Sequence, residues 1–274
     1  MNDTDQDLIL VTGGTGTLGR EVVARLRAAG RSVRVLTRHP RPEDGGIEYV
    51  AGDLGTGEGV GAAVAGAGVI VHCAGTGTSD ERLTQTLADA ARAAGSPHLV
   101  FISVVGADRI PGDRGISRLM FRYFAEKLAA ERVVAESGLP WTTLRATQFH
   151  TLISSVAGML AKLPIGLIPA GFRFQPVAAE EVAERLVELA LGAPQGLVDE
   201  MGGPQVLTTR ELFESYLAAT GGRPRPSIPL PLPGRGARAL REGGNLCPDH
   251  ATGRQTWAEF LGAGQKPVAQ PAPA

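Results

Sequence analysis

The sequence predicts an α/β protein built on a doubly wound, parallel β-sheet. Short apolar runs alternate with longer helical stretches through residues 1–150. The runs are apolar throughout rather than alternately apolar and polar, as is typical of strands covered on both faces. A glycine-rich segment directly follows the first run. Strands separated by helices and joined by right-handed crossovers give the doubly wound arrangement.

The individual elements follow from these patterns. The expected strands of the sheet are Leu8–Thr12, Ser32–Thr37, Glu48–Ala51, Val69–Cys73, Leu99–Ser103 and Trp141–Arg145. The expected helices between them are Thr17–Ala29, Glu58–Ala65, Asp80–Ala94 and Ile116–Ser137. The alternation ends after Thr147.

Beyond that point the pattern predicts a less regular structure. The expected elements are helices at Ile153–Lys162, Glu180–Leu191, Thr209–Thr220 and Trp257–Leu261, a strand at Phe172–Val177, and Pro-rich or Gly-rich segments at Leu163–Gly171 and Arg223–Pro233. We therefore expect a sheet domain at residues 1–150, a smaller C-terminal part at 151–263 packed on it, and a disordered tail at 264–274.

The composition argues against several classes of protein. Of the 274 residues, 43% are hydrophobic and 20% charged, and the net charge is −1 without a basic stripe, which argues against a nucleic-acid partner. No apolar stretch reaches the roughly 20 residues of a membrane helix. The acidic N-terminus does not resemble a signal peptide, and only two cysteines occur, so we expect a cytoplasmic protein. The five histidines show no ligand spacing, and no metal site is expected.

The glycine-rich segment VTGGTGTLGR places Gly13, Gly16 and Gly19 between the first strand and the first helix. In this position the first glycine permits a tight turn, the second leaves room for a pyrophosphate, and the third allows close packing of helix and strand. The helix N-terminus then offers free N–H groups to the phosphates. A flexible linker would not lead into an amphipathic helix. The segment therefore predicts dinucleotide binding.

The residue after the second strand indicates which dinucleotide. NAD sites usually carry an Asp or Glu there, to hold the ribose 2′-hydroxyl. This chain has Arg38, whose guanidinium suits a 2′-phosphate, and no acid before Glu43. An arginine in a solvated loop is the alternative interpretation. The sequence favours NADP(H).

A second pattern lies in FRYFAEKLAAE, where Tyr123 and Lys127 are four residues apart on one helix face. A phenol has a pKa of about 10, and a neighbouring ammonium is expected to lower it toward the range of acid–base catalysis. An aromatic core contact beside a solvated lysine is the alternative. Because the pair follows a dinucleotide-binding turn in the same chain, the sequence favours a catalytic role for it.

Together these segments resemble the short-chain dehydrogenase/reductase superfamily, and more closely its NmrA-like branch. The resemblance covers most of residues 8–262 and is carried by VTGGTGTLGREVV, VRVLTR, YVAGDL, VIVHCAG, HLVFISVVGAD, YFAEKLAAERVVAESGLPWTTLRATQFH and FQPVAAEEVAERLVELA. It implies a Rossmann fold with an NADP-type cofactor along the carboxyl ends of the strands.

The resemblance also implies roles for particular residues. The pyrophosphate would lie at Gly13, Thr15, Gly16, Thr17, Leu18 and Gly19, the 2′-phosphate at Arg38, the adenine at Asp53 and Leu54, and the ribose at Cys73, Ala74, Gly75 and Lys127. The nicotinamide and the substrate would lie at Thr147, Gln148, Phe149 and His150. For His150 a structural role is the alternative. Cys73 is expected to be a small buried residue rather than a nucleophile.

One position departs from the superfamily pattern. Active members carry a Ser or Thr near the end of the fifth strand, and its place here holds Val105. Ser103 is the one hydroxyl of that stretch and is the candidate to assist Tyr123 and Lys127.

The sequence thus predicts a monomeric or homodimeric, NADPH-dependent oxidoreductase that reduces a small apolar carbonyl or quinone. Its partner would be a small-molecule substrate, with no nucleic acid and no membrane. Val105 supports the alternative, a non-catalytic NADP-binding regulator that senses redox state.

Overall fold

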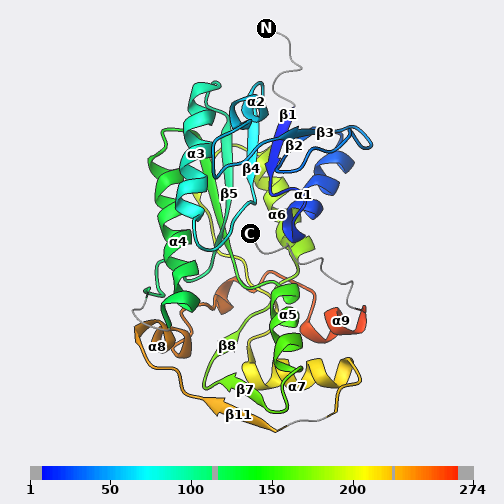
Figure 1. Ribbon diagram of the computed structural model, residues 1–274, viewed down its shortest axis with the longest axis vertical. Helices are drawn as coiled ribbons and strands as arrows, with labels where there is room; N and C mark the ends of the chain where they lie inside the picture. The colour runs from blue at the N-terminus through cyan, green and yellow to red at the C-terminus, as the bar shows by residue number, and fades with distance from the viewer. Residues whose placement is uncertain (1–7, 113–116, 224–225, 265–274) are drawn as a thin grey trace.

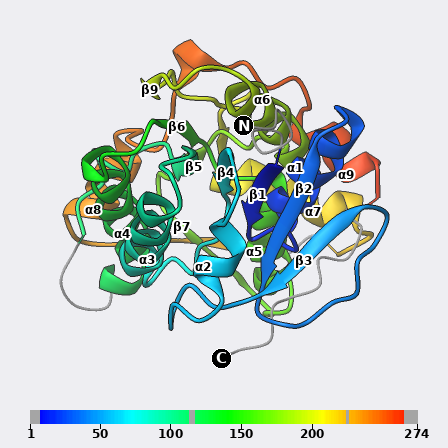
Figure 2. The same cartoon turned by 90° about the horizontal axis from the view of Figure 1, so that it is seen from above.

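The computed structural model describes residues 8–112, 117–223 and 226–264. Its centre is a sheet of seven parallel strands in the order β3-β2-β1-β4-β5-β6-β9 (Figures 1 and 2). The strands are β1 (Leu8–Thr12), β2 (Ser32–Thr37), β3 (Ile47–Ala51), β4 (Val69–His72), β5 (His98–Val104), β6 (Trp141–Ala146) and β9 (Gly196–Leu197). This order, with crossovers in both directions from β1, is the doubly wound Rossmann arrangement that the sequence predicts.

Helices cover both faces of the sheet (Figure 2). α1 (Thr17–Ala28) and α6 (Ala179–Leu191) pack on one face, and α2 (Val60–Val64), α3 (Asp80–Ala93) and α4 (Ser117–Glu136) pack on the other. The first apolar core contains fully buried Val11, Val22 and Leu186, and the second contains Leu10, Leu87 and Phe101. Adjacent residues of β1 thus enter opposite cores, which explains why its sequence is apolar throughout.

The observed bounds agree with the expected ones for most of these elements. The fourth helix was expected from Ile116, which lies outside the described residues. The second helix begins at Val60 rather than at Glu58, because Gly57 and Gly59 have φ angles of +83° and +71° and form a turn instead. None of the described helices is long and apolar enough to cross a membrane.

The C-terminal part lies at the carboxyl edge of the sheet (Figure 1). Its helices are α5 (His150–Leu160), α7 (Thr209–Ala219), α8 (Arg235–Arg241), a 3-10 turn (Pro248–His250) and α9 (Trp257–Gly262). Its strands form two small sheets, β8 (Arg173–Phe174) with β10 (Leu207–Thr208), and β7 (Gly166–Pro169) with β11 (Ser227–Leu230). The expected strand Phe172–Val177 is thus reduced to two residues.

Two Pro-rich or Gly-rich segments expected as loops contain β7 and β11, which pair in parallel. A two-stranded sheet has only edge strands, and these tolerate proline because one side needs no ladder hydrogen bond. The pairing joins segments far apart in the sequence, so no local sequence pattern predicts it.

The expected boundary at residue 150 does not separate the two parts. α6 and β9 follow that residue in the sequence, yet they complete the first core and the edge of the sheet. The reason is the apolar face of α6, on which Val182, Ala183 and Leu186 are fully buried against the sheet and α1. The tail after Gly264 lies outside the described residues.

Candidate functional site

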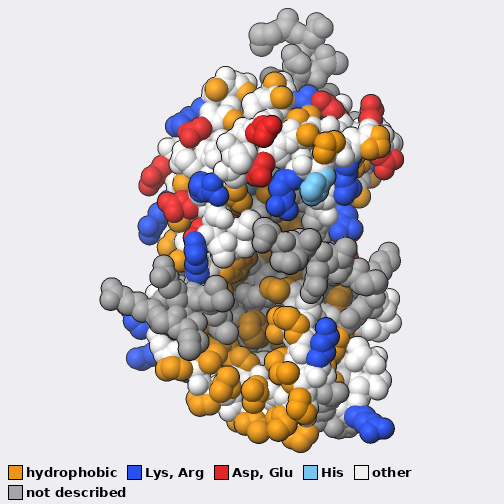
Figure 3. All heavy atoms as spheres, in the orientation of Figure 1, with side chains coloured by type: hydrophobic (Ala, Val, Ile, Leu, Met, Phe, Trp, Pro, Cys, Tyr) orange, Lys and Arg blue, Asp and Glu red, His pale blue; other side chains and the backbone are white. Residues whose placement is uncertain are grey.

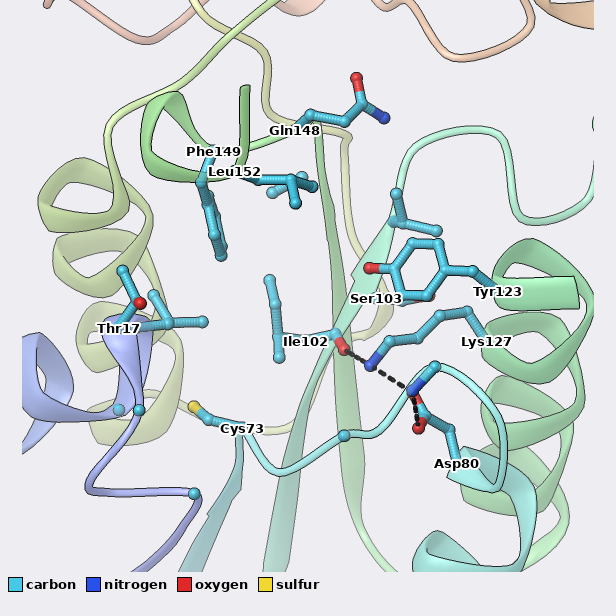
Figure 4. A pocket seen from close by; sticks show the side chains of 18 of the residues that line it. Thr17, Cys73, Asp80, Ile102, Ser103, Tyr123, Lys127, Gln148, Phe149 and Leu152 are labelled. Atoms are coloured by element: carbon cyan, nitrogen blue, oxygen red, sulfur yellow. Dashed lines mark hydrogen bonds and ion pairs between the residues drawn. The ribbon is translucent and has the colours of Figure 1, made fainter. Parts of the chain in front are cut away.

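A cavity of about 490 Å³ opens at the carboxyl ends of β1, β4, β5 and β6 (Figure 4). Parallel sheets of this order bind their ligands at this edge, on either side of the point where the strand order reverses. The glycine turn and the start of α1 form one end of the cavity. Side chains from α4 and the start of α5 form the other.

The glycine turn is shaped so that side chains are excluded from it. Gly13 has a φ of +68°, and a Cβ there would lie 2.7 Å from the backbone nitrogen of Ala74. A Cβ on Gly19 would collide with the carbonyl oxygen of Gly13. At Gly16 the nearest atom is that same oxygen, at 3.2 Å, so the space a Cβ would take is otherwise open. No side chain caps α1 at this N-terminus. The turn fits a pyrophosphate bound to free N–H groups.

Residues expected at the adenosine lie outside the cavity but at the same edge of the sheet. Arg38 follows β2 directly and is exposed, and Asp53 follows β3. The Asp53 carboxylate accepts a hydrogen bond from the backbone nitrogen of Gly55, at 2.6 Å. Leu54 is buried in the second core, which leaves its backbone rather than its side chain for a contact with adenine. Thr15 and Ala74 flank the turn without lining the cavity.

Lys127 is held by an ion pair that the sequence patterns did not indicate. Its Nζ lies 3.2 Å from Oδ2 of Asp80, donates to the carbonyl oxygen of Ile102 at 3.2 Å and lies over the ring of Phe101. Both charged side chains are buried. Asp80 also accepts hydrogen bonds from the backbone nitrogens of the loop after β4, at 2.7 and 2.9 Å. Burial would raise the pKa of the Asp80 carboxyl, but Lys127 and these N–H groups outweigh it and lower the pKa.

Tyr123 is therefore not tuned as the sequence led us to expect. Burial, and then the carboxylate of Asp80, raise the pKa of Tyr123 well above its usual value. The expectation that Lys127 lowers this pKa is wrong for the structure as it stands, because Asp80 neutralises the ammonium. The hydroxyl of Tyr123 points into the cavity (Figure 4). With its pKa raised, this hydroxyl stays protonated at neutral pH.

Below the charged pair runs a chain of buried hydrogen bonds with one consistent direction. Thr84 donates to the carbonyl oxygen of Asp80, so it accepts from Nε2 of His72, at 3.1 Å. Nδ1 of His72 must then accept from Thr12, at 2.7 Å. Burial, and then Lys127, lower the pKa of His72 to about 3. His72 is thus a neutral link that ties β1 to the start of α3.

One turn further along the same face of α4, a second ion pair fixes this helix against the sheet. Arg145 in β6 donates two hydrogen bonds to Glu131, at 2.9 and 2.7 Å. Both residues are buried, so the pair is charge-assisted and bidentate. It positions the helix that carries Tyr123 and Lys127.

Two polar side chains in the cavity wall have no partner among the described residues. They are the hydroxyl of Ser103 and the amide of Gln148. Buried polar groups without a partner are costly, so such groups indicate a ligand. Val105, the residue in the expected place of the catalytic hydroxyl, is fully buried and does not line the cavity. Ser103 does line it, so a hydroxyl is available on β5.

The residues after β6 divide into two groups. Thr147, Gln148 and Phe149 line the cavity, as expected. His150 does not: its ring stacks on both Trp257 and Phe260 of α9, which also stack on each other, and its Nε2 lies 3.2 Å from the carbonyl oxygen of Gln255. Burial lowers its pKa to about 4. This position favours a packing role over contact with substrate.

Most of the expected site residues meet in this one cavity. Those that line it are Gly13, Gly16, Thr17, Leu18, Gly19, Cys73, Gly75, Ser103, Tyr123, Lys127, Thr147, Gln148 and Phe149. Burial raises the pKa of the Cys73 thiol to about 12, so it is no nucleophile. The residues missed from the sequence include Asp80, Ile102, Leu152 and Ser155. The signal that could have indicated Asp80 is its place as an acid at the first position of the helix that follows β4. No group of His, Cys, Asp and Glu among the described residues could hold a metal ion.

Comparison with known proteins agrees with the glycine turn and the fold. A family model described as NAD(P)H-binding matches residues 13–158, more than half of the chain. The chain belongs to this NAD(P)H-binding family.

The relatives of this family member include named reductases. A (4-alkanoyl-5-oxo-2,5-dihydrofuran-3-yl)methyl phosphate reductase of Streptomyces griseus is 32% identical over 226 residues, covering 79% of this chain and 75% of its own length. An uncharacterised Mycobacterium tuberculosis protein is 29% identical over 82% of this chain, which spans only 24% of that longer relative.

Among solved structures, an NADPH-dependent quinone oxidoreductase of Escherichia coli in complex with NADPH has a TM-score of 0.75. The likeness covers 92% of this chain and 98% of that one, at 18% sequence identity. At this identity the comparison shows a shared fold.

Proposed function

We propose that the protein is an NADPH-dependent reductase of a small apolar carbonyl or quinone, of the NmrA-like branch of the short-chain dehydrogenase/reductases. One observation carries the proposal: a single cavity joins the glycine turn to the side chains of Ser103, Tyr123 and Lys127. A dinucleotide whose phosphates lie at the turn would extend along the strand ends toward these side chains.

NADPH, when bound, supplies the hydride of the reaction. Tyr123 would donate a proton or a hydrogen bond to the acceptor oxygen, and Ser103 would add a second hydrogen bond. Lys127 would bind the ribose of the cofactor and, with Asp80, hold α4 and the loop after β4 in place. Tyr123 stays protonated at neutral pH, so its hydroxyl would be available as a donor.

NADP(H) is proposed over NAD(H) because Arg38, not an acid, follows β2. The names of the relatives support a reductase, and one solved neighbour is named for quinones. The cytoplasmic location and the choice between monomer and homodimer stay predictions from the sequence.

A second candidate is a non-catalytic NADP-binding regulator. The observation that favours it is the pairing of Lys127 with Asp80, since this pair leaves Tyr123 a weak acid. The reductase would oxidise NADPH in the presence of an acceptor, whereas the regulator would bind NADPH without turnover.

The test is steady NADPH oxidation by the purified protein, followed by NADPH absorbance, with a panel of quinones and aldehydes. Turnover with any acceptor supports the reductase. NADPH binding by calorimetry without turnover on the whole panel would support the regulator instead.

A further inference from the structure

Hydrophobic side chains gather on the surface beside the cavity. They are Leu152, Val156 and Met159 on α5, Ile165 and Leu167 at β7, and Ile228 and Leu230 on β11, each 41–55% exposed. We call these seven residues the apolar face. Figure 3 shows hydrophobic side chains gathered over the lower part of the molecule, where α5, β7 and β11 lie in Figure 1. Exposed patches of this kind usually mark a binding surface.

The apolar face is built from the outer sides of two elements whose inner sides are packed. On α5, Leu152, Val156 and Met159 lie four and three residues apart and share one face, while Ala157 is buried on the opposite side. On the small sheet, Leu167 and Ile228 are register partners and point the same way, whereas Ile168 packs under Phe213. The folding of the C-terminal part therefore does not require these exposed side chains to be apolar.

The face is continuous with the cavity. Leu152 belongs to both, since it lines the cavity and is 52% exposed. The cavity has to hold the nicotinamide half of a dinucleotide within its 490 Å³. With that half bound, a long substrate would extend out of the cavity, and Leu152 of α5 leads from its lining onto the apolar face.

The charge of these segments points to the kind of occupant. Residues 151–171 contain one charged side chain, Lys162, and residues 226–233 contain none. A lipid bilayer surface is usually bound with the help of several basic residues. These segments supply only Lys162, and the two arginines that reach residues 226–233 from neighbouring helices, Arg210 and Arg241, hydrogen-bond to Ser227 and to the carbonyl oxygen of Leu232. A neutral alkyl or isoprenoid chain needs no charge.

We propose that the substrate carries an apolar chain: its carbonyl or quinone head enters the cavity, and its chain lies along the apolar face from Leu152 past Val156 and Met159. The inference rests on the proposed reductase function. The α5 stripe alone is about 10 Å long, from its helical rise, which matches a medium-length acyl chain.

The first experiment compares alkyl-p-benzoquinones from methyl to nonyl as acceptors for NADPH. A methylene fully removed from water adds about fourfold in affinity, so a chain lying half-buried on a surface should add about twofold. We expect kcat/KM to rise about twofold per methylene and to level off once the chain is longer than the face.

The second experiment uses Val156→Ser/Met159→Ser, which leaves every cavity-lining residue in place. Reduction of the methyl quinone should stay as in wild type, while the gain with chain length should largely disappear. Leu191→Ser, an equally exposed apolar residue at the end of α6, is the matched control and should keep the gain. A chain-length gain that survives in the double variant overturns the proposal.

A binding measurement separates this proposal from the proposed function. Calorimetry with the NADP⁺-loaded protein and the same quinone series needs no turnover. Affinity that rises with chain length and falls in the double variant, without turnover of any quinone, supports the apolar-chain site and contradicts the reductase. Turnover without any dependence on chain length, in rates or in binding, overturns the chain site and leaves the reductase standing.

Other occupants of the face have distinct signatures. Co-sedimentation with phosphatidylglycerol vesicles that the double variant loses would show that a lipid surface covers the face, and would overturn the proposal. A dimer in analytical ultracentrifugation that the double variant converts to monomer would show that a second copy covers it, with the same consequence.

Discussion

The two ends of the cavity are built in different ways. The end at the glycine turn consists of neighbouring residues, Gly13–Gly19, and backbone conformation alone gives it its shape. The opposite end combines Asp80, Ser103, Tyr123 and Lys127, from a helix start, a strand and a second helix, around two buried charges. The comparison teaches that a substitution in a site shaped by the backbone can abolish ligand binding while the protein stays folded. At the charged end, a substitution affects both the chemistry and the stability.

The largest expected effect is on turnover. Tyr123→Phe removes the phenolic donor and keeps the ring, so the rate of a carbonyl reduction should fall about 10²–10⁴-fold, with cofactor affinity nearly unchanged. Steady-state kinetics and NADPH titration measure the two quantities. Tyr49→Phe, in β3, is the matched control and should be neutral. Equal rates for wild type and Tyr123→Phe would remove Tyr123 from the mechanism, as a quinone reduced without acid catalysis would allow.

The next effect tests the coupling at the charged end. Lys127→Met leaves the buried Asp80 carboxylate unpaired, which should cost about 3–5 kcal/mol of the free energy of unfolding. Asp80→Asn combined with Lys127→Met should recover much of this loss, because no buried charge then remains. Lys162→Met, at an exposed lysine, is the control. Urea unfolding checks all three, and a double variant as unstable as the single one would contradict the coupling.

At the glycine end a side chain should affect binding more than stability. Gly16→Val should lower NADPH affinity about 100-fold or more, by displacing at least one charged hydrogen bond of about 1.5–3 kcal/mol and blocking others. The melting temperature of the apoprotein should change little. Gly19→Val, by contrast, should unfold the turn, since its Cβ meets the Gly13 carbonyl. If Gly16→Val bound NADPH with wild-type affinity, the pyrophosphate would have to bind elsewhere.

A smaller effect is expected where a single exposed charge acts. Arg38→Ala should remove most of a preference for NADPH over NADH, which we expect to be about tenfold to a hundredfold from one charged interaction. Arg41→Ala, three residues further along the same exposed loop, is the control. Calorimetric titrations with both cofactors measure the ratio. Equal affinities of the wild type for the two would contradict the role of Arg38.

The last effect is on the pH dependence of stability. The pKa values of His72 and His150 are lowered to about 3 and about 4 in the folded protein, from about 6.5 when unfolded. Between these values the unfolded chain binds more protons, so the free energy of unfolding should fall by about 1.4 kcal/mol per pH unit for each histidine as the pH drops below 6.5.

Above that pH the contribution is constant. Urea unfolding at a series of pH values measures the slope, which His72→Asn should reduce and His39→Asn, at an exposed position, should not. A flat profile from pH 6.5 to 4.5 would mean that His72 and His150 accept protons in the folded state.

The sequence by itself determined the first six strands of the sheet, the glycine turn and the position of Tyr123 and Lys127 on one helix. Apolar runs, helical periodicity and glycine spacing are local properties, and residues a few positions apart along a strand or helix decide them. The same locality explains the expected strands of residues 1–150, which the structure reproduces closely.

The tertiary structure decided which groups pair. In the folded protein Lys127 pairs with Asp80 rather than with Tyr123, and His150 lies in an aromatic stack. α6 packs in the first core, and β7 pairs with β11. In each case the partner lies far away in the sequence and is selected by burial: a charge taken out of water needs an opposite charge, and an apolar helix face needs a core, wherever the fold supplies them.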